Sequence, residues 1–154
     1  RLLRDLGFAH VRLPVRPERL TRRFSTASET ARALDEAKRA LDLLFAADYA
    51  VALDLHPGER FETLLRDDPA AGAADAIEAW TRLARTLAGT PRSRLCFELL
   101  NEPPVPAEIW AAQAPKLADA IRAEAPDHTL VVGPTGFQRA EALAAMTPLA
   151  PDSA

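Results

Sequence analysis

The stretch LCFELLNEPP, residues 95–104, is an apolar run that turns acidic and then ends at two prolines. Its length and apolar content predict a buried strand that ends near Asn101. Alternate residues of a strand face opposite sides of the sheet. One side of this strand carries Leu95, Phe97 and Leu99, and the other carries Cys96, Glu98, Leu100 and Glu102. The strand therefore has an apolar side and a side whose carboxyl groups lie toward its C-terminal end.

Three other short apolar stretches predict strands. They are residues 8–15 (FAHVRLPV), 49–56 (YAVALDLH) and 128–134 (HTLVVGP). In the first two of these, the ionisable residues Arg12, Asp54 and His56 fall on one side, and the Val and Leu residues fall mainly on the other. Three of the four predicted strands thus have one side suited to covering helices and one side that becomes ionisable toward the C-terminal end.

Apolar residues at helical spacing separate the predicted strands. The expected helices cover residues 28–48, 73–89 and 107–126, a short helix precedes the first strand, and another begins near residue 139. Ser28 and Thr30 are the capping candidates of the first long helix. Strands that alternate with helices in this way are typical of right-handed βαβ units on a parallel sheet. The sequence therefore predicts an α/β fold.

Two architectures agree with four parallel strands: a small doubly wound sheet and half of an eight-stranded barrel. A doubly wound sheet buries both faces under helices, so its strands read as almost uniformly apolar. The ionisable side of the strands here favours a barrel interior that becomes polar at its mouth, because active sites of (β/α)8 barrels lie at the C-terminal rim. We therefore expect a partial (β/α)8 TIM barrel of about four parallel strands with covering helices.

The composition of the 154-residue chain excludes several classes of protein. It is 48% hydrophobic and 27% charged, as is ordinary for a globular domain, and its formal net charge is −3. The charges are scattered, so neither nucleic acid nor a membrane surface is an expected partner. No stretch reaches the roughly 18 consecutive apolar residues of a membrane span. Ligands for a metal site are too few and too scattered, and we expect no metal and no cofactor.

Three motifs taken together carry a family resemblance. GFAHVRLPV (7–15), YAVALDLHPGERF (49–61) and LCFELLNEP (95–103) resemble glycoside hydrolase family 5, the cellulase-type retaining glycosidases of the (β/α)8 superfamily. The resemblance implies that residues 1–154 are part of a catalytic domain that is truncated at both ends and holds barrel strands two to five. It also implies hydrolysis of O-glycosidic bonds in β-linked glucans, with a polysaccharide or oligosaccharide as the substrate, and a secreted or periplasmic location.

The resemblance assigns roles to four residues. Glu102 matches the acid/base, which must stay protonated near working pH; burial would favour this state and a neighbouring cation would oppose it. Asn101 matches the amide that binds the sugar 2-hydroxyl. Arg12 matches the arginine that keeps the nucleophile ionised, and His56 matches a histidine that lines the subsite of cleavage. Many relatives have a second histidine where this chain has Pro57.

The residues themselves leave some alternatives open. Arg12 could form an interior ion pair with Asp54 or Glu98, because these lie on the same side of the sheet. The segment of Glu59, Arg60 and Phe61 is expected to be a loop at the rim of the barrel that could contact sugar. Phe137 or Gln138, after the fourth strand, could reach the same cleft, whereas His10, His128, Trp80 and Trp110 are expected to be structural.

The nucleophile of the family has no counterpart before Ala154. The family pattern continues with a His-x-Tyr strand, a strand that bears the nucleophilic glutamate and an aromatic platform. A retaining mechanism needs two carboxyl groups about 5 to 5.5 Å apart, so we expect the isolated chain to be inactive. Two alternatives are a non-catalytic half-barrel that binds carbohydrate or assembles with another half, and a doubly wound domain of other function.

Overall fold

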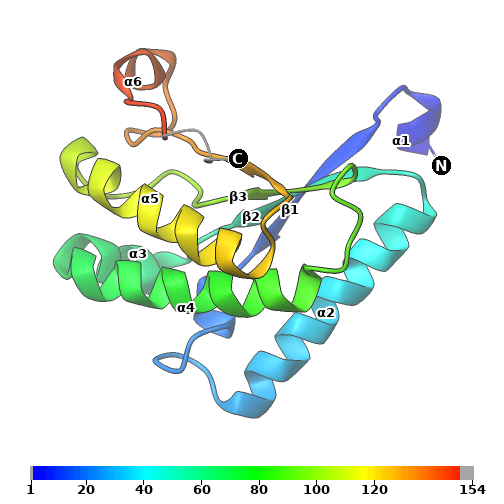
Figure 1. The fold of residues 1–154 in the computed structure, drawn as a ribbon, viewed down its shortest axis with the longest axis horizontal. Coiled ribbons are helices and arrows are strands. Elements are labelled where there is room, and N and C mark those ends of the chain that lie inside the picture. Colours follow the sequence, from blue (N-terminus) through cyan, green and yellow to red (C-terminus); the bar gives the residue numbers. More distant parts are fainter. Residues whose placement is uncertain (1, 150–154) are drawn as a thin grey trace.

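The computed structural model describes residues 2–149 and contains one four-stranded sheet (Figure 1). Neighbouring strands are parallel, and their order β1-β2-β3-β4 follows the chain. The strands are β1 (His10–Val15), β2 (Ala50–Leu55), β3 (Leu95–Glu98) and β4 (Thr129–Val131). All four predicted strands are present, and each is shorter than its apolar run. Beyond β3 the chain stays close to the sheet, because the Leu99 N–H donates to the carbonyl of Val131.

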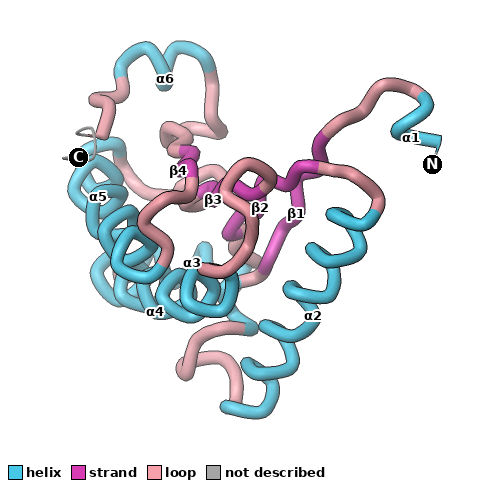
Figure 2. Tube along the Cα trace, turned by 45° about the vertical axis from the view of Figure 1, so that its right-hand side comes forward, coloured by secondary structure: helices cyan, strands magenta, loops and turns pink. Residues whose placement is uncertain are grey.

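The long helices pack against one side of this sheet. In chain order the helical elements are α1 (Leu2–Asp5), a 3-10 turn η1 (Pro17–Arg19), α2 (Ala27–Ala46), α3 (Glu59–Asp67), α4 (Pro69–Leu87), α5 (Ala107–Glu124) and α6 (Ala140–Ala145). Figure 2 shows α2, α4 and α5 arranged around the outside of the strands. The buried core joins apolar residues of these helices, such as Leu41, Trp80 and Ile121, to those of β2 and β3.

The two sides of the sheet differ as the alternation of residues predicts. Leu53 and Phe97, which face the helices, are fully buried. On the inner side, which is the side that bears Arg12, the register aligns Pro14, Asp54, Glu98 and Val131 across the four strands. Arg12 and Val131 are exposed there. A doubly wound sheet would have both sides covered, whereas helices on one side only correspond to part of a (β/α)8 barrel.

The cap of α2 differs from the prediction. Thr26, and not Ser28 or Thr30, is the N-cap, and its side chain accepts from the Glu29 N–H while Glu29 accepts from the Thr26 N–H. This reciprocal pair is a capping box, which the Thr-x-x-Glu spacing indicates. Thr30 is instead buried against the core. The long helix therefore begins before the predicted start.

The segment after β2 is a helix and not the expected rim loop. Glu59–Asp67 form α3, in which Phe61 is fully buried and packs against Phe24, with ring centroids 6.0 Å apart. Gly58 is the N-cap, and its N–H donates to Oε1 of Glu18 at 2.9 Å. A Cβ atom at Gly58 would lie 2.3 Å from Nη1 of Arg16 and 2.6 Å from Oε1 of Glu18, so a larger residue would displace the ends of these two side chains.

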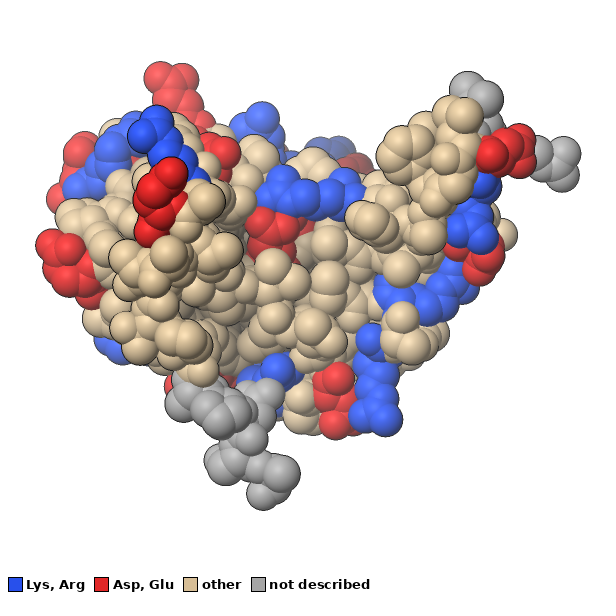
Figure 3. All heavy atoms as spheres, turned by 90° about the horizontal axis from the view of Figure 1, so that it is seen from above, with Lys and Arg blue, Asp and Glu red and all other residues tan. Residues whose placement is uncertain are grey.

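The helices formed by residues 2–149 include none with the length and apolar character that crossing a bilayer requires. Acidic and basic side chains are interspersed on the face shown in Figure 3, and no continuous stripe of one sign crosses it.

Pro115 lies inside α5 without ending the helix, which continues to Glu124.

Candidate active site

Arg12 is the centre of a charged cluster on the inner side of the sheet. Its Nε donates to Oε2 of Glu98 and its Nη2 donates to Oε1, each at 2.7 Å. The same Nη2 lies 3.0 Å from Oδ2 of Asp54. A planar guanidinium that binds a carboxylate through two parallel hydrogen bonds is held in a defined orientation. Both expected ion-pair partners of Arg12 are therefore present.

The pKa values of Asp54 and Glu98 are shifted in opposite directions. Burial of Asp54, which is fully buried, raises its pKa despite the opposing effects of the His56 hydrogen bond and the Arg12 charge. Burial would also raise the pKa of Glu98, but the hydrogen bonds and charge of Arg12 outweigh it and leave that pKa lowered. The pKa of Arg12 is raised, first by the Glu98 hydrogen bond and, against the effect of burial, by nearby acidic charges that include Glu102.

Asn101 and His56 join the cluster from the ends of β3 and β2. The Oδ1 atom of Asn101 accepts from Nη2 of Arg12 at 2.9 Å, and its Nδ2 lies 3.5 Å from Nε2 of His56. Nδ1 of His56 lies 2.8 Å from Oδ2 of Asp54. The Asn101 N–H donates to the carbonyl of Leu55, which fixes the end of β3 against the end of β2. The structure thus brings Arg12, His56 and Asn101 together.

Glu102 follows this cluster in an unusual backbone conformation. Its φ angle is 41°, in the left-handed region that residues other than glycine seldom adopt, and two prolines follow it. Its side chain is exposed. Within that same part of the chain the carboxylate has no hydrogen-bond partner. Glu102 is therefore free to contact a ligand at the rim.

The indole of Trp80 supports the strand end that carries these residues. Its Nε1 donates to the Leu99 carbonyl at 2.7 Å, and its ring packs edge-on against Phe97. Leu99 lies two residues before Asn101, so α4 helps to hold the polar segment in place. The prediction that Trp80 is a packing residue is confirmed by its full burial.

Of the residues after β4, Gln138 reaches the cluster and Phe137 does not. Nε2 of Gln138 lies 3.5 Å from Oε1 of Glu98. Phe137 is 72% exposed, and both residues have positive φ angles. His128 is buried and stacks on Phe97, as a structural residue would, whereas His10 is exposed on the inner side of β1.

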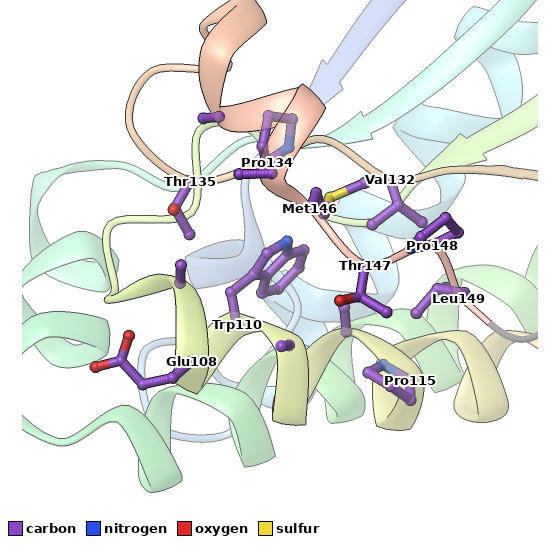
Figure 4. A pocket seen from close by; sticks show the side chains of 15 residues that line it. Glu108, Trp110, Pro115, Val132, Pro134, Thr135, Met146, Thr147, Pro148 and Leu149 are labelled. Carbon is purple, nitrogen blue, oxygen red and sulfur yellow. The ribbon is translucent and has the colours of Figure 1, made fainter.

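A separate apolar pocket lies between α5 and the segment that follows β4. Its volume is about 540 Å³, and Trp110, Val132, Met146 and Leu149 are among the side chains that line it (Figure 4). Trp110 is almost fully buried, and its Nε1 donates to the Gly133 carbonyl at 2.8 Å. Among the described residues that line it, Glu108 is the sole ionisable one, and none belongs to the Arg12 cluster. Residues 2–149 contain no group of three or more His, Cys, Asp or Glu side chains placed to hold a metal ion.

Glu98 is expected to stabilise the fold near neutral pH. Because its pKa is lowered in the folded chain, this stabilisation is present above the unfolded value of 4.5 and is lost as the pH falls through the folded value. Replacement by glutamine removes the contribution, so the free energy of unfolding of Glu98→Gln falls less steeply below about pH 4.5 than that of the wild type. Urea unfolding at a series of pH values measures both slopes, with Glu62→Gln, in a partly exposed pair with Arg66, as the control. Parallel curves for Glu98→Gln and the wild type would contradict the expectation.

The whole chain matches the family described as cellulase (glycosyl hydrolase family 5), over residues 1–154. The chain belongs to glycosyl hydrolase family 5. One family relative, Endoglucanase 3 of Fibrobacter succinogenes, is 37% identical over 81 residues, which are 49% of this chain and 12% of the relative. The chain therefore spans a small part of that longer protein.

Two solved structures show the same fold. One described as an endoglucanase superposes with a TM-score of 0.85 at 20% identity, over 98% of this chain and 48% of its own. Cel5A of Thermotoga maritima, solved in complex with mannotriose, superposes with a TM-score of 0.82 at 21% identity, over 98% of this chain and 47% of its own. The chain thus has the fold of about half of each of these proteins, which confirms the predicted partial barrel.

Proposed function

We propose that residues 1–154 are part of a longer family 5 catalytic domain, truncated at both ends, which cleaves internal O-glycosidic bonds of β-linked glucans with retention of configuration. The observation that carries the proposal is the exposed carboxylate of Glu102 beside the cluster of Arg12, His56 and Asn101; Arg12 lies within β1, and the other three follow the C-terminal ends of β2 and β3. Family membership, the similarity to Endoglucanase 3 and the endoglucanase structure of which this chain covers 48% support it.

In the proposed reaction Glu102 is the acid/base. It protonates the oxygen of the leaving sugar as the glycosidic bond breaks, and it then takes a proton from the water that releases the covalent intermediate. Asn101 donates from its amide to the 2-hydroxyl of the sugar, and this contact strengthens in the transition state. His56 contacts the sugar at the cleaved bond, and Arg12 keeps the nucleophile ionised. No cofactor takes part.

The nucleophile is proposed to come from outside this chain. A retaining mechanism needs a second carboxylate about 5 to 5.5 Å from the acid/base. Asp54 and Glu98 are acids on the inner side of the sheet, but both are buried and paired with Arg12. Neither is available to attack an anomeric carbon. Barrel strands six to eight, which this assignment places after β4, would supply the attacking group.

The experiment compares the full-length protein with the isolated 154-residue chain on a soluble β-1,4-glucan. Release of reducing ends by the full-length protein, with the β-anomer as the first product by proton NMR, is expected. The isolated chain is expected to release none. An α-anomer as the first product, or equal turnover by the isolated chain, would contradict the proposed mechanism.

A non-catalytic role is the second candidate, and it is favoured by the open inner side, where Arg12 and Val131 are exposed. In this role the half-barrel binds carbohydrate or assembles with another half. It predicts that cello-oligosaccharides bind without turnover in the full-length protein and that Glu102→Gln leaves their affinity unchanged. Calorimetric titration beside the activity assay separates the two candidates.

A further inference from the structure

Four side chains from three different segments close a ring on the inner side of the sheet. Arg12 contacts Asp54 at 3.0 Å and Asn101 at 2.9 Å, Asp54 contacts His56 at 2.8 Å, and His56 faces Asn101 at 3.5 Å. Asp54 has no assigned part in the reaction, yet it is the one member that is fully buried. Burying a carboxylate costs free energy unless the group is paired with a cation and hydrogen-bonded.

The directions of the donors around this ring agree with one another. A carboxylate only accepts hydrogen bonds, so the Asp54 Oδ2 atom, which lies 3.0 Å from Nη2 of Arg12 and 2.8 Å from Nδ1 of His56, requires the proton of His56 to lie on Nδ1. Nε2 of His56 then carries a lone pair. The Asn101 Oδ1 atom accepts from Arg12, so the amide NH₂ is the group that faces Nε2.

We propose that Asp54 is a positioning residue that fixes His56 as the Nδ1–H tautomer and, together with Arg12, fixes the amide of Asn101 with its NH₂ group available to the sugar. One amide hydrogen points to His56, and the second is left for the 2-hydroxyl. The expected effect of Asp54 on catalysis rests on the proposed function. The expected effect of Asp54 on the tautomer of His56 does not depend on turnover.

The first test measures the tautomer in the full-length protein. Long-range proton–nitrogen NMR spectra of protein labelled with ¹⁵N-histidine distinguish the two neutral forms, and the His56→Gln variant identifies the signals of His56. The wild type is expected to show Nδ1 protonated and Nε2 unprotonated. In Asp54→Asn the carboxamide can donate to Nδ1, so a shift toward the Nε2–H form is expected.

Asp75→Asn is the matched control, because Asp75 is also buried and also paired with an arginine, Arg23, at 2.6 Å. It belongs to α4 and lies outside the ring. The tautomer of His56 is expected to be unchanged in this variant. An Nε2–H form in the wild type, or the same spectrum for wild type and Asp54→Asn, would overturn the proposal.

The second test asks whether Asp54 acts through the 2-hydroxyl contact. The kcat/KM of the full-length protein is measured for a β-glucoside substrate and for its 2-deoxy counterpart. The ratio of the two values is expected to be at least about tenfold smaller in Asp54→Asn than in the wild type, because the amide is no longer oriented. A residue that only stabilises the fold would lower both values equally, and an unchanged ratio therefore counts against the proposal.

The two tests also separate this inference from the proposed function. If the full-length protein shows no glycosidase activity but His56 changes its tautomer in Asp54→Asn, the proposed function fails and the positioning role of Asp54 stands. If the protein hydrolyses glucans and the tautomer is the same in both forms, the proposed function stands and the positioning role fails.

Discussion

Glu102→Gln in the full-length protein is expected to lower kcat on a natural β-glucan by about 10²- to 10⁴-fold, the usual contribution of a general acid–base group. The amide has the shape of the carboxyl group but cannot supply a proton to the leaving oxygen. Since Glu102 is exposed, and its carboxylate has no hydrogen-bond partner among residues 2–149, the midpoint of thermal unfolding is expected to stay within about 1 °C of the wild type.

The leaving group provides a sharper form of this experiment. A 2,4-dinitrophenyl glycoside needs no proton to depart, so the formation of the covalent intermediate is expected to be far less affected than with a natural glucan. Azide, which attacks without a general base, is expected to accelerate the second step of the variant. Glu59→Gln is the control, because Glu59 is also an exposed rim acid. Equal losses on both substrates would refute the acid/base role.

Arg12→Ala is expected to have the second largest effect, on both stability and turnover. It leaves the carboxylates of Asp54 and Glu98 side by side and buried without their cation. Removing one partner of a buried ion pair costs roughly 3–5 kcal/mol. The Arg12 side chain is 40% exposed, so water reduces this to an expected loss of about 2–3 kcal/mol in the free energy of unfolding.

The origin of that loss can be checked by pH and by a conservative variant. The loss is expected to shrink toward acidic pH, since protonation removes the charges left without a partner. Arg12→Lys keeps the charge but not the two parallel hydrogen bonds to Glu98, so it is expected to recover only part of the stability. Arg22→Ala is the control because the Arg22 side chain is 84% exposed in its ion pair with Glu78. A loss that is the same at pH 4 and pH 7 would point to lost packing instead.

The sequence predicts the fold well because alternation of residues decides which side of a strand is buried. Strands at residues 49–56 and 94–101 have large apolar residues at alternate positions, and these are the positions that the helices cover. The N-cap of α2 was predicted wrongly, and residues 59–61, predicted to be a loop, form the start of α3. Thr26 lies before the first apolar residue of its helix, and α3 is short enough for its polar residues to resemble a loop.

The candidate site could be predicted as a set of residues but not as a geometry. The inner-side positions of Arg12 and His56 follow from the alternation of residues along their strands. Strict alternation would place Asn101 on the opposite side, with Leu99, and Asn101 joins the cluster because β3 already ends at Glu98. The ring through Asp54, and the approach of Gln138 to Glu98, depend on side-chain conformations and on a turn with positive φ angles, which no local pattern specifies. The exposure of Glu102 depends on the left-handed backbone at that residue.

The neighbour-to-neighbour order of the strands also determines when the site can form during synthesis. Because β1 pairs with β2 and β2 with β3, each new strand can add to the sheet as it leaves the ribosome. Arg12 emerges early, but the amide that it holds lies 89 residues later, at Asn101. A nascent chain that stops before β3 therefore carries an arginine and an aspartate without their amide partner. The contact between Arg12 and Asn101 can therefore form only after β1, β2 and β3 have all been synthesised.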